Sequence, residues 1–372
     1  MADQTRRLLL RAAAFVPART LRSSQANSAV TVGLIGAGGR GTLDAQLLVE
    51  HTGARLAAVC DLFDDRIERA RARIPAPEAK VYKDYRDLLA SPVDAVLIAT
   101  PVFLHPEHFE AAAKAGKHIY IEKPAGADVA GCKRLMRAAD SAPRRLNIAF
   151  GFQQRFAPLS RKAQQLVASG GIGRLVTAHS HWLKNEITAG EKPAPRPTSE
   201  LERIRLWKNW RDTYGDFIVE TYCHGIDVLN WFCGGHPLKA VASGSRTLTR
   251  RGDLRDQCSV SFTYPNEIQG SLVGTQLAPA WYRDVHEYFI GTEGVVETAR
   301  EYWKHHRSRT NILEEREPRD VTIDALTEFV RRVREGKPDN TALSGAESTL
   351  TAILARTAMD LKREVSWEEM MA

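Results

Sequence analysis

Short apolar runs alternate with amphipathic stretches along the first half of the chain. Five runs have the length and composition of buried strands: residues 30–35, 56–59, 93–99, 118–121 and 147–150. Stretches with helical spacing of apolar residues, such as 43–51 and 106–115, lie between them. Strands that alternate with helices are typical of βα units, whose strands pair in parallel. The pattern therefore predicts an α/β domain over residues 30–150, a doubly wound parallel sheet of the Rossmann type.

A glycine-rich segment follows the first of these strands and opens a helix. Residues 36–41 read Gly-Ala-Gly-Gly-Arg-Gly, which matches the pattern G-x-G-x-x-G. Gly36 permits a tight turn, Gly38 lets the backbone approach a pyrophosphate, and Gly41 lets helix and strand pack closely. The helix N-terminus adds N–H donors and partial positive charge. We expect a dinucleotide site here, with Gly39 and Arg40 in the same loop.

An acidic residue, Asp61, follows the second predicted strand. At this place a carboxylate accepts hydrogen bonds from the adenosine ribose hydroxyls and repels a 2′-phosphate. Asp61 therefore favours NAD over NADP. Arg66 is close enough in sequence to keep NADP as the less favoured alternative.

Two further groups of polar residues follow later strands. Thr100-Pro101, with His105, comes after the run at 93–99, and Glu122-Lys123-Pro124 comes after 118–121. Open α/β sheets bind their ligands at the carboxyl ends of the strands. We therefore expect Thr100, Pro101, His105, Glu122 and Lys123 to lie along the cofactor.

With these motifs in place, the sequence resembles the glucose–fructose oxidoreductase and inositol dehydrogenase (Gfo/Idh/MocA) family. The similarity includes residues 171–175, 289–295 and 323–362 and so extends over nearly the whole chain. The resemblance implies a second, α+β domain over residues 151–372 with a large open, mostly antiparallel sheet. Its closing helices are expected to pack back on the first domain.

The resemblance also implies hydride exchange between a nicotinamide and a hydroxyl-bearing carbon of a sugar or cyclitol. Lys123 matches the lysine of the family's E-K-P motif, near the reacting oxygen. The family's D-x-x-x-H-x-x-D signature corresponds to Glu220, His224 and Asp227, with glutamate in place of the first aspartate. That replacement changes the reach of the carboxylate, so the substrate position can differ.

Alcohol oxidation needs a base and a group that stabilises a developing alkoxide. His224, whose ordinary pKa lies near neutrality, suits the base, with a neighbouring carboxylate to fix its tautomer. Lys123 suits the stabilising role, and desolvation would lower its pKa enough to let it share the proton transfer. The two roles can also be exchanged. On one helix, Glu220, His224 and Asp227 would share a face.

Further candidates surround these residues in the sequence. Arg155, Tyr222 and Trp182 are expected to contact the substrate. An aromatic and basic cluster that includes Trp207 precedes the signature, and its Trp210-Arg211 resembles a family pair that lines the cofactor cleft. Core packing is the alternative for any single tryptophan.

Composition excludes several other classes of protein. The 372 residues are 43% hydrophobic, and no apolar run reaches the roughly 18 residues that a membrane span needs. The net charge of +7 is concentrated in residues 1–29, with five arginines against one aspartate, so we expect no nucleic-acid partner. Five cysteines without a CxxC pair give no disulfide framework. No metal site is expected, because His179 and His181 have no third ligand nearby in the sequence.

The N-terminal 29 residues carry Arg6-Arg7 ahead of an apolar stretch, as in a twin-arginine export signal. Export to the periplasm or outside the cell is expected, with a disordered basic tail and a cytoplasmic protein as the alternative.

The leading functional hypothesis is an NAD-dependent sugar or polyol oxidoreductase. The alternative is an NAD-dependent glycoside hydrolase, which oxidises the sugar transiently to ease elimination; Thr221 departs from the tyrosine that such hydrolases tend to carry. A non-enzymatic sensor is a third hypothesis. By analogy with the family, we expect a homodimer or homotetramer.

Overall fold

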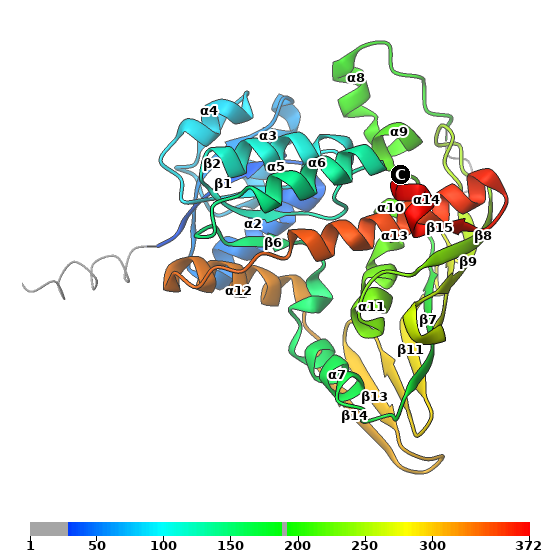
Figure 1. Cartoon of the computed structure of the whole chain (residues 1–372). Coiled ribbons are helices and arrows are strands. Elements are labelled where there is room, and N and C mark those ends of the chain that lie inside the picture. Colours follow the sequence, from blue (N-terminus) through cyan, green and yellow to red (C-terminus); the bar gives the residue numbers. More distant parts are fainter. Residues whose placement is uncertain (1–28, 188–191) are drawn as a thin grey trace, which may run out of the picture.

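The computed structural model describes residues 29–187 and 192–372. They form two domains that lie side by side, with the C-terminal helices running between them (Figure 1). Nearly all of the predicted export signal, residues 1–28, lies outside the described residues.

The first domain contains a parallel sheet of six strands in the order β3-β2-β1-β4-β5-β6. Its strands are β1 (Thr31–Ile35), β2 (Arg55–Cys60), β3 (Lys80–Tyr82), β4 (Ala95–Ile98), β5 (His118–Ile121) and β6 (Ile148–Phe150). Its helices are α2 (Gly39–Thr52), α3 (Asp64–Arg73), α4 (Tyr85–Ala90), α5 (His105–Lys114) and α6 (Val129–Asp140). The predicted doubly wound α/β fold is confirmed.

Burial on both faces explains why the apolar runs identified most of this sheet. All four residues of β4 are buried, as expected for a central parallel strand covered by helices on both sides. Edge strand β3 was not predicted, because it has three residues and two of them are exposed.

The second domain contains a sheet of nine strands in the order β14-β13-β12-β11-β7-β10-β9-β8-β15. Every neighbouring pair is antiparallel except β7 with β10, so the predicted open, mostly antiparallel sheet is confirmed. The strands are β7 (Leu175–Leu183), β8 (Lys239–Ser245), β9 (Gln257–Thr263), β10 (Gln269–Thr275), β11 (Asp284–Gly291), β12 (Val295–Thr298), β13 (Tyr302–His306), β14 (Ile312–Arg316) and β15 (Val365–Ser366).

Helices cover one face of this sheet. They are α7 (Pro158–Ala168), α11 (Cys223–Cys233) and α13 (Ala342–Leu361). Along β7, Ser180 and Trp182 are buried beneath α11, whereas His179 and His181 point to the other face and are partly exposed. Gly225 lets α11 approach closely, because a Cβ there would lie 2.1 Å from the Ser180 hydroxyl.

The C-terminal helices join the two domains. Helix α12 (Val321–Glu335) packs on α2, and its Phe329 shares a core with Leu34 and Leu48. Helix α13 packs on α6 of the first domain and on β8 of the second. Thr349 of α13 accepts a hydrogen bond from the Ala125 N–H at 2.9 Å.

Several short helices complete the chain. They are α8 (Glu200–Arg205), α9 (Arg211–Tyr214), α10 (Phe217–Glu220) and α14 (Trp367–Met371), with the 3-10 turns η1 (Val102–Leu104), η2 (Gln153–Arg155), η3 (Trp207–Asn209) and η4 (Pro265–Glu267).

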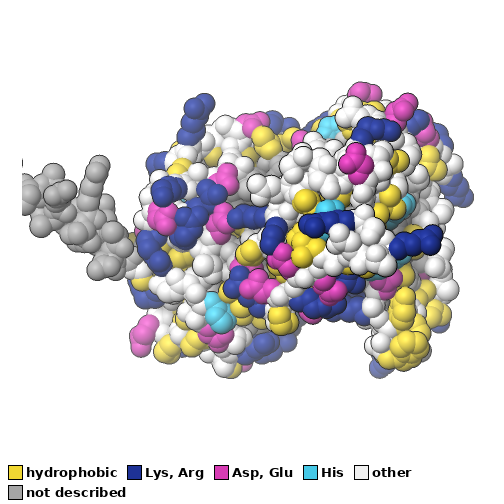
Figure 2. Space-filling view, turned by 90° about the horizontal axis from the view of Figure 1, so that it is seen from below, with side chains coloured by type: hydrophobic (Ala, Val, Ile, Leu, Met, Phe, Trp, Pro, Cys, Tyr) yellow, Lys and Arg dark blue, Asp and Glu magenta, His cyan; other side chains and the backbone are white. Residues whose placement is uncertain are grey.

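The surface has mixed charge. Figure 2 shows Lys and Arg side chains interspersed with Asp and Glu over one face of the molecule. Within residues 29–187 and 192–372, no helix has the length and apolar character required to cross a membrane.

Candidate functional site

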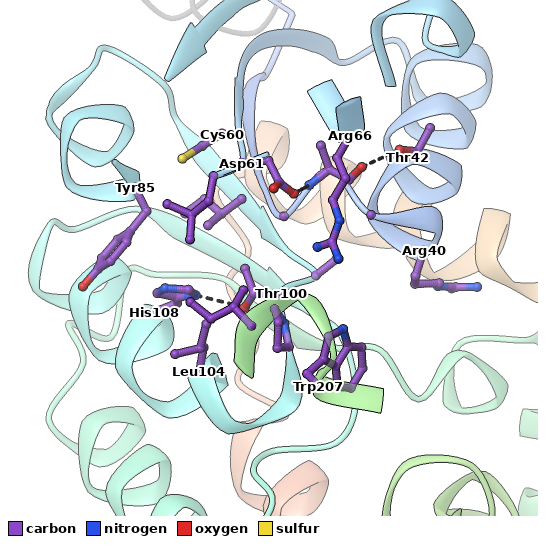
Figure 3. Close-up of a pocket in the computed structure, with 18 of the residues that line it drawn as sticks. Arg40, Thr42, Cys60, Asp61, Arg66, Tyr85, Thr100, Leu104, His108 and Trp207 are labelled. Atoms are coloured by element: carbon purple, nitrogen blue, oxygen red, sulfur yellow. Dashed lines mark hydrogen bonds between the residues drawn. The ribbon is translucent and has the colours of Figure 1, made fainter. Parts of the chain in front are cut away.

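A cleft of about 1060 Å³ opens at the carboxyl ends of β1, β2 and β4 (Figure 3). The glycine loop forms one wall. Gly36 has φ +97°, and a Cβ there would lie 2.7 Å from the Ala99 carbonyl oxygen, so only glycine fits. A Cβ on Gly41 would lie 2.0 Å from the Gly36 oxygen, which explains the close packing of α2 on the loop.

The middle of the loop leaves open space. Among the described residues, and apart from its chain neighbours, no atom lies within 4 Å of a Cβ built on Gly38 or Gly39, and no side chain in this part of the protein caps the first turn of α2. The first N–H groups of α2 are therefore available to an anion at the positive end of the helix. This loop fits the pyrophosphate of a dinucleotide.

Asp61 lines the cleft and is buried. One carboxylate oxygen accepts the Ala37 N–H at 2.9 Å, and the other accepts the Phe63 N–H at 3.0 Å. These bonds fix the carboxylate against the glycine loop. Each oxygen keeps a second lone pair with which to accept a ribose hydroxyl.

The second domain closes over this cleft. Trp207 and Lys208 of η3 and Arg205 of α8 are among the lining residues. Arg205 forms an ion pair with Asp65 of α3 at 2.8 Å and stacks over Phe63 at 4.4 Å. These contacts join the segment between β7 and α11 to the first domain.

A smaller cavity of about 190 Å³ adjoins the cleft. The two share Arg40, Ala99, Thr100, Trp207 and Lys208 in their walls. The remaining lining residues of the smaller cavity are Val102, His105, Glu122, Lys123, Gln153, Glu220, His224 and Arg300. Lys123, Glu220 and His224, three of the predicted site residues, are thus brought together.

Lys123 and Glu220 form a buried ion pair. The Lys123 ammonium donates to the Glu220 carboxylate at 3.0 Å and to the Glu220 backbone oxygen at 2.6 Å. Burial is the largest single influence on Lys123 and by itself would lower its pKa, but Glu220, together with Cys223 and Glu122, more than offsets it and the pKa is raised. Burial would raise the pKa of Glu220, but the charges of Lys123 and Lys208 and the hydrogen bonds from Lys123 and Thr221 bring it down to about 2. Desolvation acts in the predicted direction, but the expected net fall in the pKa of Lys123 is not found, because of this pairing.

His224 is held between aromatic rings. It stacks on Trp182 at 5.4 Å and meets Phe152 edge-on at 6.0 Å. Burial lowers the pKa of His224 well below its ordinary value, and the nearby cations, Lys123 and Arg300 foremost, lower it further. The imidazole is therefore neutral at neutral pH.

The expected helix face is not observed. Helix α10 ends at Glu220, and α11 begins at Cys223. The Tyr222 N–H donates to the Phe217 oxygen, a wider spacing than the i to i−4 bond of an α-helix. This junction separates Glu220 from the helix that carries His224.

Asp227 belongs to a buried structural pair. Its carboxylate accepts hydrogen bonds from Arg155 at 2.9 Å and from the Ser348 hydroxyl at 2.7 Å. Asp227 and Arg155 lie outside the lining of both cavities, and no carboxylate contact to His224 is present within the described residues. The expected carboxylate partner of His224 is therefore not observed.

Three other predicted residues, Pro101, His105 and Glu122, also belong to the cavity walls. The Nε2 and Nδ1 atoms of His105 lie 2.8 and 2.7 Å from the carbonyl oxygens of Thr100 and Pro124, and the neutral ring donates its one N–H to one of them. Glu122 pairs with Arg40 at 3.0 Å. Pro101 lines the cleft.

Besides Arg155, four predicted aromatic and basic residues lie outside the lining of both cavities: Trp182, Tyr222, Trp210 and Arg211. Trp182 is buried and stacks on His224. Tyr222 is buried, with its hydroxyl 3.3 Å from the Asp256 oxygen. Trp210 and Arg211 lie behind the site, and Arg211 pairs with Asp360 at 2.6 Å. Trp207 and Lys208, three residues earlier, occupy the cavity walls instead.

Sequence reasoning missed Gln153, Lys208 and Arg300. Arg300 follows β12, far along the chain from the other site residues, and no motif marks it. Its buried Nε–H has no hydrogen-bond partner within the described residues.

Comparison with known proteins identifies the family. Residues 30–150 match the model of the GFO/IDH/MocA oxidoreductase family, NAD-binding Rossmann fold, and residues 160–297 match the GFO/IDH/MocA C-terminal domain. The chain belongs to this oxidoreductase family. The predicted family and the NAD cofactor are confirmed.

Relatives cover most of the chain. A myo-inositol 2-dehydrogenase of Thermotoga maritima is 27% identical over 362 residues, which cover 91% of this chain and 99% of the relative. Inositol 2-dehydrogenase 2 of Saccharopolyspora erythraea is 30% identical over 66% of this chain and 71% of its own length.

Solved structures agree in fold. A levoglucosan dehydrogenase in complex with NADH and levoglucosan superposes with a TM-score of 0.79 at 19% identity, covering 91% of this chain and 99% of that one. A myo-inositol 2-dehydrogenase from Lactobacillus plantarum gives 0.73 at 22% identity, with the same coverage. The NAD-dependent oxidoreductase predicted from the sequence thus has the expected architecture.

Proposed function

We propose that this oxidoreductase oxidises a hydroxyl-bearing carbon of a sugar or cyclitol in the cavity formed by Lys123, Glu220 and His224. The observation that carries the proposal is the position of these residues, in a cavity that shares a wall with the nucleotide cleft. The inositol and levoglucosan dehydrogenases described above support this substrate class. Bound NAD supplies the hydride acceptor.

His224 acts as the base. Its imidazole is neutral, and its ring nitrogens have no hydrogen-bond partner within the described residues, so one of them can accept the hydroxyl proton. The Trp182 and Phe152 rings orient the imidazole without competing for that nitrogen.

Lys123 stabilises the oxygen that loses the proton. An ammonium has three N–H donors, and two of them point to Glu220. The third is available to the substrate oxygen, where a fixed positive charge favours the developing alkoxide. The raised pKa of Lys123 keeps that charge in place. Arg300 offers a further donor from the opposite domain.

The test is NADH formation by purified protein across free sugars, cyclitols and aryl glycosides, with product analysis. We expect NADH to accumulate with a free sugar or cyclitol. Glycoside cleavage without net NADH would instead support the hydrolase alternative.

Replacing Lys123 by methionine tests whether this residue takes part in the reaction. Lys123→Met should lower turnover by about 10²- to 10⁴-fold, because the electrostatic donor is lost. NAD affinity, followed by fluorescence titration, should change little. Full residual turnover in this variant would contradict the assignment.

A further inference from the structure

Three side chains with metal-ligating atoms meet on the outer face of the nine-stranded sheet. His181 comes from β7, and Asp284 and His286 come from β11. His181 and His286 are direct partners in the antiparallel pairing of these strands. Asp284 and His286 are two residues apart on one strand, so their side chains share a face. Helix α11 packs on the opposite face, so this cluster is separate from the cavity of Lys123 and His224.

The donor atoms of the cluster point toward one another. The Nδ1 atom of His181 lies 3.1 Å from one oxygen of Asp284, and the Nδ1 atom of His286 contacts the other oxygen. All three ligand atoms lie within 4.8 Å of one another. The side chains of His181, Asp284 and His286 are 36%, 21% and 14% exposed, so an ion can enter from solvent.

The two histidine rings are held by few other contacts. Their centroids are 4.9 Å apart, and His286 also meets Tyr288 edge-on at 4.6 Å. The Nε2 atom of His286 is buried without a hydrogen-bond partner within the described residues. With Nδ1 as the ligand atom, the ring proton resides on Nε2, where no acceptor holds it within the described residues.

We propose that His181, Asp284 and His286 bind a transition-metal dication of the Zn²⁺ type. Two imidazoles and one carboxylate form the ligand set of many three-residue zinc sites, in which the fourth position is left to water. Mg²⁺ and Ca²⁺ prefer oxygen donors, so the two nitrogens disfavour them. Donor atoms around tetrahedral Zn²⁺ lie roughly 3.4 Å apart, close to the spacing of His181 and Asp284.

The sequence alone did not reveal this site. His181 and His179 are two residues apart, and no third ligand lies near them in the sequence. The two missing ligands are on β11, which the fold places beside β7 although about one hundred residues separate them. His179 points to the same face but bonds Ser271 at 2.7 Å instead. This difference makes His179 a matched control.

The experiment is a Co²⁺ titration of the full chain, saturated with NAD, from which any affinity tag and bound metal have been removed. We expect one Co²⁺ per chain, with visible d–d absorption, no intense sulfur charge-transfer band, and displacement by Zn²⁺. The missing sulfur band excludes the cysteines as ligands. His181→Ala and His286→Ala should each weaken binding by at least about tenfold. His179→Ala should leave it unchanged.

Asp284→Asn is the milder variant, since its amide preserves side-chain volume and one acceptor oxygen. It should also weaken Co²⁺ binding, with melting curves in chelator showing that the variant is folded. Absence of stoichiometric Co²⁺ binding by the wild type would overturn the proposal and leave a hydrogen-bonded His–Asp–His cluster. Equal affinity in the wild type and the His286 variant would overturn it as well.

Discussion

Lys123 and Glu220 keep each other ionised inside the protein. For either group, burial alone shifts the pKa toward the neutral form, since desolvation penalises the charged form. The second oxygen of Glu220 accepts the hydroxyls of Tyr214 at 2.9 Å and Thr221 at 2.8 Å, so the carboxylate is fully satisfied. Glu220 is therefore a positioning residue that holds the ammonium of Lys123 toward the cavity.

The first prediction concerns Glu220→Gln. The amide oxygen can still accept from Lys123, but the negative charge is lost, so burial is left to lower the pKa of Lys123. The alkaline limb of the kcat/KM profile, where the ammonium deprotonates, should move to lower pH. A pH profile of NADH formation measures this shift.

Glu220→Asp provides the control, because it restores the charge with a shorter side chain. Its alkaline limb should stay near that of the wild type even if KM changes. An unshifted limb in Glu220→Gln would mean that Glu220 does not set the charge state of Lys123.

The second prediction concerns the acid limb. His224 accepts a proton only when neutral, and burial lowers its pKa well below the ordinary value near 6.5. Activity should therefore not decline as the pH falls to about 6.5, and should decline only below it. The kcat/KM profile on the acid side measures this, and an acid limb centred at or above the ordinary histidine pKa would contradict it.

The lowered pKa of His224 also affects the stability of the folded protein. The unfolded chain binds a proton at His224 below pH about 6.5, whereas the folded chain does not, so this group lowers stability as the pH falls through that value. His224→Gln should lessen the loss of stability in acid.

At the level of single residues, motifs predicted the polar groups at strand ends but not residues brought in by distant segments. Lys123 and His224 meet as expected. Lys123 follows a strand that the apolar pattern made recognisable, and His224 was located by the signature of the family. Arg300 and Lys208 reach the cavity from a strand connection and a one-turn helix, and no pattern fixes where such segments pack. Trp210-Arg211 resembled a cofactor-lining pair, but it lies behind the site.

At the level of elements, buried parallel strands were the clearest signal. The apolar runs located five of the six strands of the first sheet. The second sheet was predicted only from the family resemblance. Its strands expose one face, so buried and exposed residues alternate along them and no continuous apolar run marks them. The break between α10 and α11 was missed because a helical wheel assumes one continuous helix, whereas the Tyr222 to Phe217 hydrogen bond rotates the following turn.

The third prediction belongs to α8. Its Arg205 forms an ion pair with Asp65 across the nucleotide cleft, and both groups are partly exposed. An exposed pair contributes up to about 1 kcal/mol, so Arg205→Ala should speed NADH release by no more than about fivefold. Stopped-flow fluorescence measures this rate.

Arg71→Ala is the matched control for α8, because Arg71 is an exposed arginine of α3 outside the cleft lining. Its release rate should equal that of the wild type. The pair is also screened by salt, so the difference between the wild type and Arg205→Ala should shrink at high ionic strength. Equal release rates for wild type and Arg205→Ala at low salt would show that α8 does not retain the nucleotide.

At the level of the whole molecule, two expectations stay predictions. Export depends on residues 1–28, and the homodimer or homotetramer rests on analogy with the family. The outer face of the second sheet, which carries His179 and His181, also exposes Val241 and Val273. Light scattering on the purified protein would give the mass of the assembly directly.

One of the two hydrophobic cores is shared by both domains. A single cluster of buried residues extends from Ile98 and Phe150 of the first sheet to Phe262 and Phe289 of the second. Helix α13 lies along this cluster, and Gly345 packs so closely that a Cβ would lie 2.5 Å from the Phe150 ring. Unfolding either domain would therefore expose apolar surface of the other.

The last prediction follows from this shared core. Thermal unfolding should be one cooperative transition. NAD should raise the midpoint temperature of the whole transition, although the nucleotide binds mainly to the first domain. At 100 times its dissociation constant, a ligand that binds only the folded state adds about 2.7 kcal/mol. Gly345→Ala should lower the midpoint temperature of this single transition and reduce the free energy of unfolding by about 1–3 kcal/mol, because the added methyl group overpacks the contact with Phe150. Differential scanning calorimetry with and without NAD measures both effects, and two transitions of which NAD moves only one would show that the domains unfold independently.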